Sequence, residues 1–295
     1  MTQQPLRRPL DPRRRACAPG ELLAWALALA LLTPALQGQG VPGAGTPSTP
    51  GGGVVERSDS LLQAGASEEA FAVLAEHLAS APDDFEARWR AVRLAVSLSV
   101  VGPSHGIRSR WALEADAHGR ELLRVRPDDP EALAWAAAAR GRHALHEEGM
   151  RTPARLAKET WSLTEALLAR YPGHPLGNHV RGKLCQQVAG LPRAARLFGR
   201  MFLGGELVGQ ATWVRAEEHH LRAVTGDPGM VFFYLELGET LAAQGKSEAA
   251  ARVFQAGLAV PARFPVDQRF KRMMSERLDV VEGPLGADLR YDSRL

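Results

Sequence analysis

A recurring proline turn is the feature that most constrains the fold of this chain. Four helix-like runs end at a proline, and a large apolar residue lies four places before each one. The pairs are Leu78 and Pro82, Leu123 and Pro127, Leu168 and Pro172, and Val224 and Pro228, so successive prolines are 45, 45 and 56 residues apart. A period of this size is typical of stacked units that cannot bury their apolar faces alone. The repeat predicts a helical solenoid, an architecture that usually binds other molecules.

The composition favours helices over strands. Alanine and leucine are abundant, aromatic residues make up only 6%, and apolar residues reach 45%, which is enough for a full core. Ala and Leu lose little conformational freedom in a helix, so we expect an all-α chain. The apolar period of 3.6 predicts helix pairs over 54–64 and 68–80, 85–98 and 108–125, 130–148 and 154–171, 176–188 and 212–224, and 230–243 and 247–260. An extra helix is expected over 191–202, and a terminal helix begins at Asp267.

Local signals place several helix ends. Gly65 stops the first helix and Ser67 caps the second, while Asp129 caps a helix that has Pro130 in its first turn. Residues 101–106 contain Gly, Pro and Ser, and we expect a loop there.

The last pair contains the most specific motif. Its residues fall at helical spacings in the order Tyr234, Leu237, Gly238, Leu241, Gly245, Ala250, Phe254, Leu258 and Pro261. This pattern resembles the tetratricopeptide repeat, in which small residues allow two helices to approach closely and aromatic residues fill the space between pairs. We therefore expect a right-handed helical-repeat solenoid of tetratricopeptide-like pairs, sealed by a C-terminal capping helix.

A second resemblance is narrower. The stretch Asn-His-Val-Arg-Gly-Lys at 178–183 precedes Ala-Gly-Leu at 189–191, an apolar segment at 197–205, then Ala216 and Pro228. This order resembles the regulator of microtubule dynamics family, a tetratricopeptide-like group with bacterial members, over about residues 84–280. The resemblance implies a helical binding domain, no catalytic residues and no cofactor, and we interpret the chain as a bacterial-type member.

The N-terminal region is predicted to be a targeting segment. Arginines precede an apolar run at 22–32, which suits a signal peptide and is short for a membrane span. Residues 1–35 are therefore a signal peptide or an N-terminal anchor, 36–53 a flexible Gly/Pro linker, 54–280 the repeat domain and 281–295 a disordered tail. The protein is expected to be exported, either periplasmic or secreted, or else tethered to the membrane through 22–32.

The charge distribution argues against nucleic acid as a partner. The chain has a net charge of +3, and residues 1–35 alone carry five arginines against two acids. The rest of the chain has 31 basic and 31 acidic side chains, so no basic excess remains in the predicted repeat domain. The residues after 35 include one cysteine, Cys185, on an apolar helix position where it is expected to be a small buried hydrophobe.

No catalytic or metal-binding motif stands out. His143 and His146 share a helix face with Glu147 beside them, but the order differs from that of zinc-binding helices, so a solvated helix face is the expectation. His219 and His220 are adjacent and point in different directions, and His220 is expected to be partly buried. We predict a protein that is not an enzyme and binds no metal.

The predicted binding surface is the concave face. In tetratricopeptide-like stacks the first helix of each pair lines that face, and the resemblance assigns it Trp89, Arg93, Ala138, Arg142, His179, Lys183, Gln187, Leu235 and Glu239. Three cations, one anion and an aromatic ring suit an acidic peptide or an anionic headgroup. The leading prediction is a scaffold or adaptor in the cell envelope that binds a segment of a protein partner. The alternative is a carrier or sensor of a small apolar or lipid ligand, which requires an apolar lining instead of charges.

Overall fold

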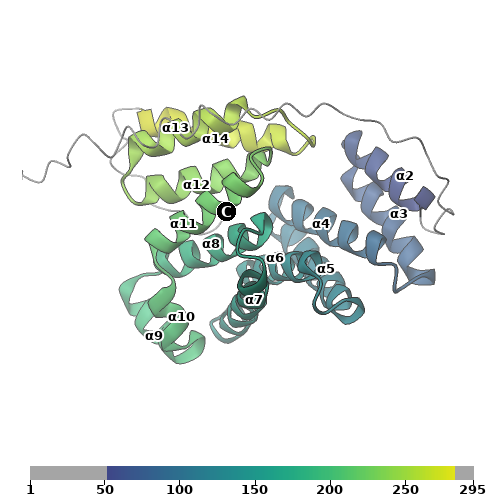
Figure 1. Ribbon diagram of the computed structural model, residues 1–295, viewed down its shortest axis with the longest axis horizontal. Helices are drawn as coiled ribbons and strands as arrows, with labels where there is room; N and C mark the ends of the chain where they lie inside the picture. The colour runs from purple at the N-terminus through teal and green to yellow at the C-terminus, as the bar shows by residue number, and fades with distance from the viewer. Residues whose placement is uncertain (1–51, 283–295) are drawn as a thin grey trace, which may run out of the picture. The chain divides into compact units, whose positions relative to one another are not determined.

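The computed structural model describes residues 52–282, and every regular element in that range is an α-helix (Figure 1). The helices are α2 (Gly52–Gln63), α3 (Ser67–Ser80), α4 (Phe85–Val101), α5 (His105–Val125), α6 (Pro130–His146), α7 (Arg151–Arg170), α8 (Pro175–Gly190), α9 (Arg193–Leu203), α10 (Gly205–Gln210), α11 (Trp213–Gly226), α12 (Val231–Ala243), α13 (Ser247–Ala259) and α14 (Asp267–Glu282). The all-α prediction is confirmed. The predicted targeting segment, most of the predicted linker and the predicted tail from 283 lie outside the described residues.

Side-chain caps explain where many of these helices begin. Asp84 caps α4 by accepting from the Ala87 amide at 3.1 Å, and Asp129 caps α6, whose first residue is Pro130. The imidazole of His174 caps α8 by accepting from the Gly177 amide at 3.2 Å. The prediction at Asp129 is confirmed.

Some helix ends differ from the prediction. The expected loop at 101–106 shrinks to residues 102–104, because α4 continues to Val101 and Ser104 caps α5 by accepting from the Ile107 amide. Ser67 is the first residue of α3 and does not cap it, whereas Gly65 ends the preceding helix with a φ of +84°. Gly52 and Gly53, predicted as linker, begin α2, and Val281 and Glu282 complete α14.

The helices pack as successive antiparallel pairs. Most helices pack against their neighbours in sequence, but α8 packs against α11, and α9 and α10 are inserted between those two partners (Figure 1). The extra helix predicted at 191–202 is therefore confirmed as α9, and the short α10 follows it after Gly204 at a φ of +90°. This insertion accounts for the longer spacing of 56 residues between the last two prolines.

The α12–α13 pair has the close packing that the repeat motif predicts. A Cβ atom at Gly238 would lie 2.1 Å from Cε1 of Phe254, and Phe254 and Ala250 are completely buried. A Cβ atom at Gly257 would lie 2.6 Å from Cβ of Tyr234. Only glycine fits at either contact, so the tetratricopeptide-like prediction for this pair is confirmed.

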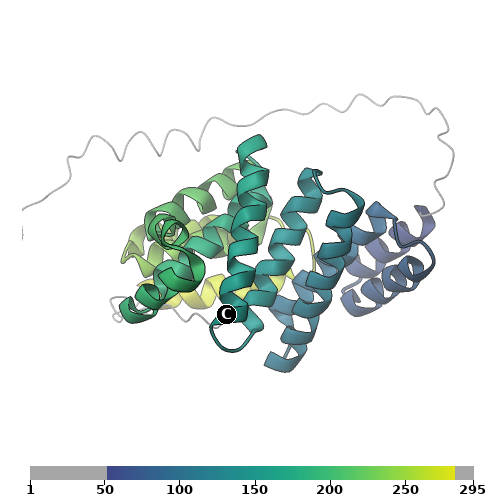
Figure 2. The same cartoon turned by 90° about the horizontal axis from the view of Figure 1, so that it is seen from below.

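The last repeat returns to the early helices of the described region. The terminal helix α14 buries Phe270 and Met274 against α12 and α13, as predicted. Phe264, just before α14, packs with the core of α3 to α6, and Arg269 donates a 3.0 Å hydrogen bond to the Val101 carbonyl of α4. Figure 2 shows the same helices turned by 90°. This hydrogen bond links α14 to the end of α4 across the stack.

Candidate ligand-binding cavity

A cavity of about 660 Å³ lies inside the helical stack. Side chains from α4, α6, α7, α8, α9 and α12, and from the segment that leads into α14, line it. Most of the lining is apolar, including Leu98, Trp135, Leu145, Leu184, Phe202 and Phe232. The stacking of helix pairs therefore leaves a continuous apolar hollow instead of a shallow polar groove.

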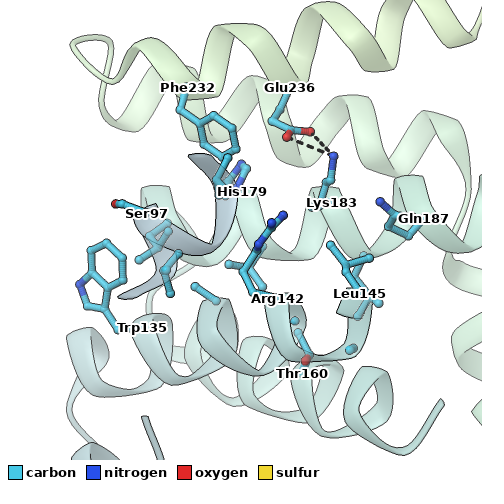
Figure 3. A pocket seen from close by; sticks show the side chains of 18 of the residues that line it. Ser97, Trp135, Arg142, Leu145, Thr160, His179, Lys183, Gln187, Phe232 and Glu236 are labelled. Carbon is cyan, nitrogen blue, oxygen red and sulfur yellow. Dashed lines mark hydrogen bonds and ion pairs between the residues drawn. The ribbon is translucent and has the colours of Figure 1, made fainter. Parts of the chain in front are cut away.

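Three charged groups face each other in this cavity (Figure 3). Nζ of Lys183 lies 2.8 Å and 3.1 Å from the two carboxylate oxygens of Glu236, which links α8 to α12. Arg142 on α6 donates to the carbonyl of Ser99 at 2.8 Å and to its hydroxyl at 3.2 Å. Burial lowers the pKa of Arg142 to about 10, against the opposing effect of Glu236, so Arg142 remains a cation at neutral pH.

His179 is a buried neutral side chain beside these charges. Its ring stacks on Phe233 with centroids 5.1 Å apart and meets Phe232 edge-on at 5.0 Å. Burial is the main cause that lowers its pKa to about 4, so the imidazole is uncharged at pH 7. Among residues 52–282, nothing forms a hydrogen bond with its Nδ1 atom.

Aromatic rings and a paired arginine form another part of the lining. Trp89 of α4 stacks with Trp135 of α6 at 6.4 Å between centroids. The guanidinium of Arg93 lies 5.1 Å from the Trp89 ring centroid and 3.0 Å from a carboxylate oxygen of Asp59. Asp59 therefore offsets the charge of Arg93, and the face that Arg93 helps to form is largely aromatic.

Of the nine residues predicted on the concave face, seven line the cavity. They are Trp89, Arg93, Ala138, Arg142, His179, Lys183 and Gln187. Glu239 is not among the lining residues, which corrects that prediction. Its carboxylate accepts from Arg277 of α14 at 3.3 Å, because α14 covers this face of α12. Leu235 is also buried away in the core, and burial raises the pKa of Glu239.

The residues of α12 that line the cavity are Phe232, Phe233 and Glu236, none of which is predicted from the sequence. Phe232 and Glu236 are four residues apart and share one helix face, shifted by three residues from Leu235 and Glu239. Trp135 was also missed, although it shares a face with Ala138 and Arg142 at spacings of three and seven. Phe202 had no sequence signal, since the inserted α9 lies outside the repeat pattern.

The other candidate groups have structural roles. His143 bonds to Asp116 at 3.0 Å and to Glu147 at 2.9 Å, within a partly buried charge network that also holds Arg140. The expectation of a solvated face at His143 is therefore wrong. His220 is completely buried, and burial raises the pKa of the buried Cys185 thiol to about 11. In the part of the chain that the structure describes, no group of three or more His, Cys, Asp or Glu side chains is arranged to hold a metal ion.

Together, the paired helices and the apolar hollow between them define the class: a tetratricopeptide-like helical-repeat protein with a largely apolar cavity. The particular family follows from the sequence. Residues 54–282 match the family described as regulator of microtubule dynamics protein 1-3, and the chain belongs to that family. This confirms the resemblance seen at 178–228.

Comparisons with individual proteins are more distant. None of the curated proteins matches the sequence closely enough to count as a relative. Among solved structures, the MamA RS-1 ArsTM double mutant is 16% identical, with a TM-score of 0.38, and the match covers 76% of this chain and 95% of that one. The human IFIT1 dimer with PPP-AAAA is 17% identical, with a TM-score of 0.42, and the match covers 79% of this chain. This chain spans 56% of the length of IFIT1, so the class rests on the family and on the helix packing itself.

Within residues 52–282, none of the helices combines the length and the apolar content needed to span a bilayer.

Proposed function

We propose that this chain is a non-catalytic scaffold that binds an elongated apolar or lipid ligand inside its helical stack. The observation that supports this most directly is the cavity of about 660 Å³ with its predominantly apolar lining. Ligand sites of this kind are typically about 300–1,000 Å³ and combine an apolar wall with a few polar groups that set orientation. The cavity of this protein has the same features, with Arg142, Lys183 and Glu236 as the polar groups.

The charges favour this ligand over an acidic peptide. Three cations were expected to attract an acidic partner, but Arg93 pairs with Asp59 and Lys183 pairs with Glu236. Both pairs reduce the positive potential that an acidic segment would need. Because the cations are largely paired, the burial of the ligand's apolar part against the lining would supply most of the binding free energy.

A partner segment in the groove is the second candidate. Seven residues expected on the concave face of a tetratricopeptide-like stack line the cavity, including the stacked ring of Trp89. A protein segment that inserts an apolar side chain between Trp89 and Trp135 would use the same lining. The exported cell-envelope setting of either function is also a proposal, and it rests on the apolar run at 22–32.

The ligand proposal can be tested by filling the cavity. Ala157 of α7 lines it, so Ala157→Trp should occupy part of the space, whereas Ala166 lies exposed on the same helix. We expect cis-parinaric acid, a fluorescent fatty acid, to bind the full chain saturably and with one-to-one stoichiometry. Ala157→Trp should weaken this binding at least about tenfold, and Ala166→Trp should leave it unchanged.

Thermal unfolding of both variants checks that each remains folded. Fatty acid binding that is equal in the wild type and in Ala157→Trp would place the ligand outside the cavity and contradict the proposal. Absence of saturable fatty acid binding in the wild type would favour the partner segment instead.

A further inference from the structure

Helix α9 (Arg193–Leu203) presents an unusual combination of side chains. Ala195, Gly199 and Phe202 lie on the side that lines the cavity. On the other side, Leu197 and Met201 are 67% and 76% exposed, the two largest values among the exposed large apolar residues of the described region. They are four residues apart, so they form one apolar ridge on the surface of the helix.

A strip of arginines runs beside this ridge. Arg193, Arg196 and Arg200 are spaced by three and four residues, so they share one face, and α9 contains no acidic residue. Successive residues in an α-helix are rotated by about 100° about the helix axis, so this basic face lies next to Leu197 and Met201. The helix is therefore basic and apolar on the surface that it leaves uncovered.

The positive surface continues onto α7, which packs against α9. Arg151, Arg155 and Lys158 are exposed on α7, and they line a shared hollow with Phe202 of α9. The one acid in that hollow, Glu159, is already bound by Arg140 and Arg155.

Elsewhere on the inserted segment, Glu206 of α10 is an exposed acid, and it accepts a hydrogen bond from Gln210 at 3.0 Å. The basic residues of α7 and α9 together therefore outnumber the acids beside them. A partner whose charge complements this basic face is anionic.

We infer that α9 docks onto an anionic lipid bilayer, with Leu197 and Met201 among the headgroups and the arginine strip against lipid phosphates. Short helices with basic and bulky apolar side chains bind membranes in this orientation. The exposed face of α9 offers no Ser, Thr, Asn or Gln side chain that would pair specifically with a folded protein partner. Because the opposite side of α9 lines the cavity, docking would place the cavity wall directly at the membrane.

This inference does not depend on what the cavity binds, and it can be tested separately. Met201→Cys in a Cys17→Ser background allows an environment-sensitive fluorophore to be attached to α9 of the full chain. The native Cys185 is buried and its thiol pKa is raised to about 11, so it should not be labelled at neutral pH. A fluorophore at the exposed Leu221 of α11, introduced as Leu221→Cys, serves as the reference position.

We expect vesicles of phosphatidylcholine mixed with phosphatidylserine to shift the emission at position 201 to the blue, and vesicles of phosphatidylcholine alone to shift it much less. The fluorophore at position 221 should not respond. Because each basic residue near an anionic surface strengthens association about fivefold, losing three of them weakens it about a hundredfold, and reversing Arg193, Arg196 and Arg200 to Glu should weaken the vesicle response at least that much.

A matched control has the same change in net charge. Arg120, Arg222 and Arg272 are exposed on other helices, and their reversal to Glu should retain the vesicle response at position 201. The inference is overturned if the emission at 201 ignores anionic vesicles or if the control reversal abolishes the response equally. It is also overturned if the shift appears without vesicles as the protein concentration rises, since the face would then bind a second copy.

Discussion

Single residues decide whether the repeat units can pack at all. Gly238 faces the ring of the fully buried Phe254, and a Cβ atom there would lie 2.1 Å from the ring atom Cε1. Neither α12 nor the ring has free space to move, since Phe254 belongs to the core of the last repeats. The resemblance to the tetratricopeptide repeat predicts a close approach of the two helices at Gly238, whereas the contact of Gly238 with the Phe254 ring is apparent only in the structure.

Replacing Gly238 tests that contact. Gly238→Ala should destabilise the protein by about 1–3 kcal/mol, the usual cost of overpacking a core, and lower the midpoint of thermal unfolding. Gly106→Ala is the matched control, because Gly106 lies in α5 and a Cβ atom there has no neighbour within 4 Å. We expect the control to be neutral or slightly stabilising. Equal stability of Gly238→Ala and the wild type would contradict the close packing.

The same residue scale shows where prediction from sequence fails. Glu239 was placed on the binding face, but the structure pairs it with Arg277. The error arose because the sequence does not reveal which face of α12 the terminal helix covers. The positions that the resemblance assigns to the concave face on α4, α6 and α8 all line the cavity.

At the scale of helices, one ion pair joins α8 to α12 across the cavity. The side chains of Lys183 and Glu236 are only 16% and 6% exposed, and they lie 2.8 Å apart. Removing one partner from a buried pair leaves an uncompensated charge, which typically costs about 3–5 kcal/mol.

We therefore expect Glu236→Ala to destabilise the protein by about 3 kcal/mol in urea unfolding. Lys183→Met combined with Glu236→Leu should cost less than Glu236→Ala, because no buried charge is then left unpaired. The control is Glu248→Ala, which removes an exposed partner of Arg252 and should have little effect. A Glu236→Ala variant as stable as Glu248→Ala would show that the pair does not hold the two helices together.

The inserted helices show a different limit of prediction from the sequence. The sequence predicts α9 from its apolar spacing and from the longer interval between prolines, but α10 has only six residues and gives no comparable signal. The role of α9 as a cavity wall was not predictable, because Gly199 and Phe202 join residues of α7 and α8 in lining the cavity only through the tertiary fold.

At the scale of the described region, a long-range contact joins distant repeats beside the cavity. The repeat pattern predicts an open solenoid, since each unit is expected to contact only its neighbours. The structure instead brings Arg269 to the Val101 carbonyl across 168 residues. Contacts at such separation leave no periodic trace in a single sequence, so the fold class was predictable and this long-range contact was not.

Buried histidines make the stability of this region depend on pH. Burial is the largest cause that lowers the pKa of His118, His146, His179 and His219 to about 4, and it lowers the pKa of His220 well below its ordinary value. In the unfolded chain these imidazoles titrate near pH 6.5. Between about pH 6.5 and about pH 4 the unfolded state therefore binds more protons than the folded state, and stability rises with pH in that window.

We expect the midpoint of thermal unfolding to be highest above pH 6.5 and to fall by several degrees as the pH is lowered toward about 4.5. His179→Gln should make this decline shallower, because glutamine takes up no proton in either state, while the remaining buried histidines preserve part of it. The measurement is differential scanning calorimetry of both proteins across the pH range. A midpoint that stays constant or rises as the pH falls would mean that these imidazoles accept protons in the folded protein, and that the interior is more hydrated than its packing indicates.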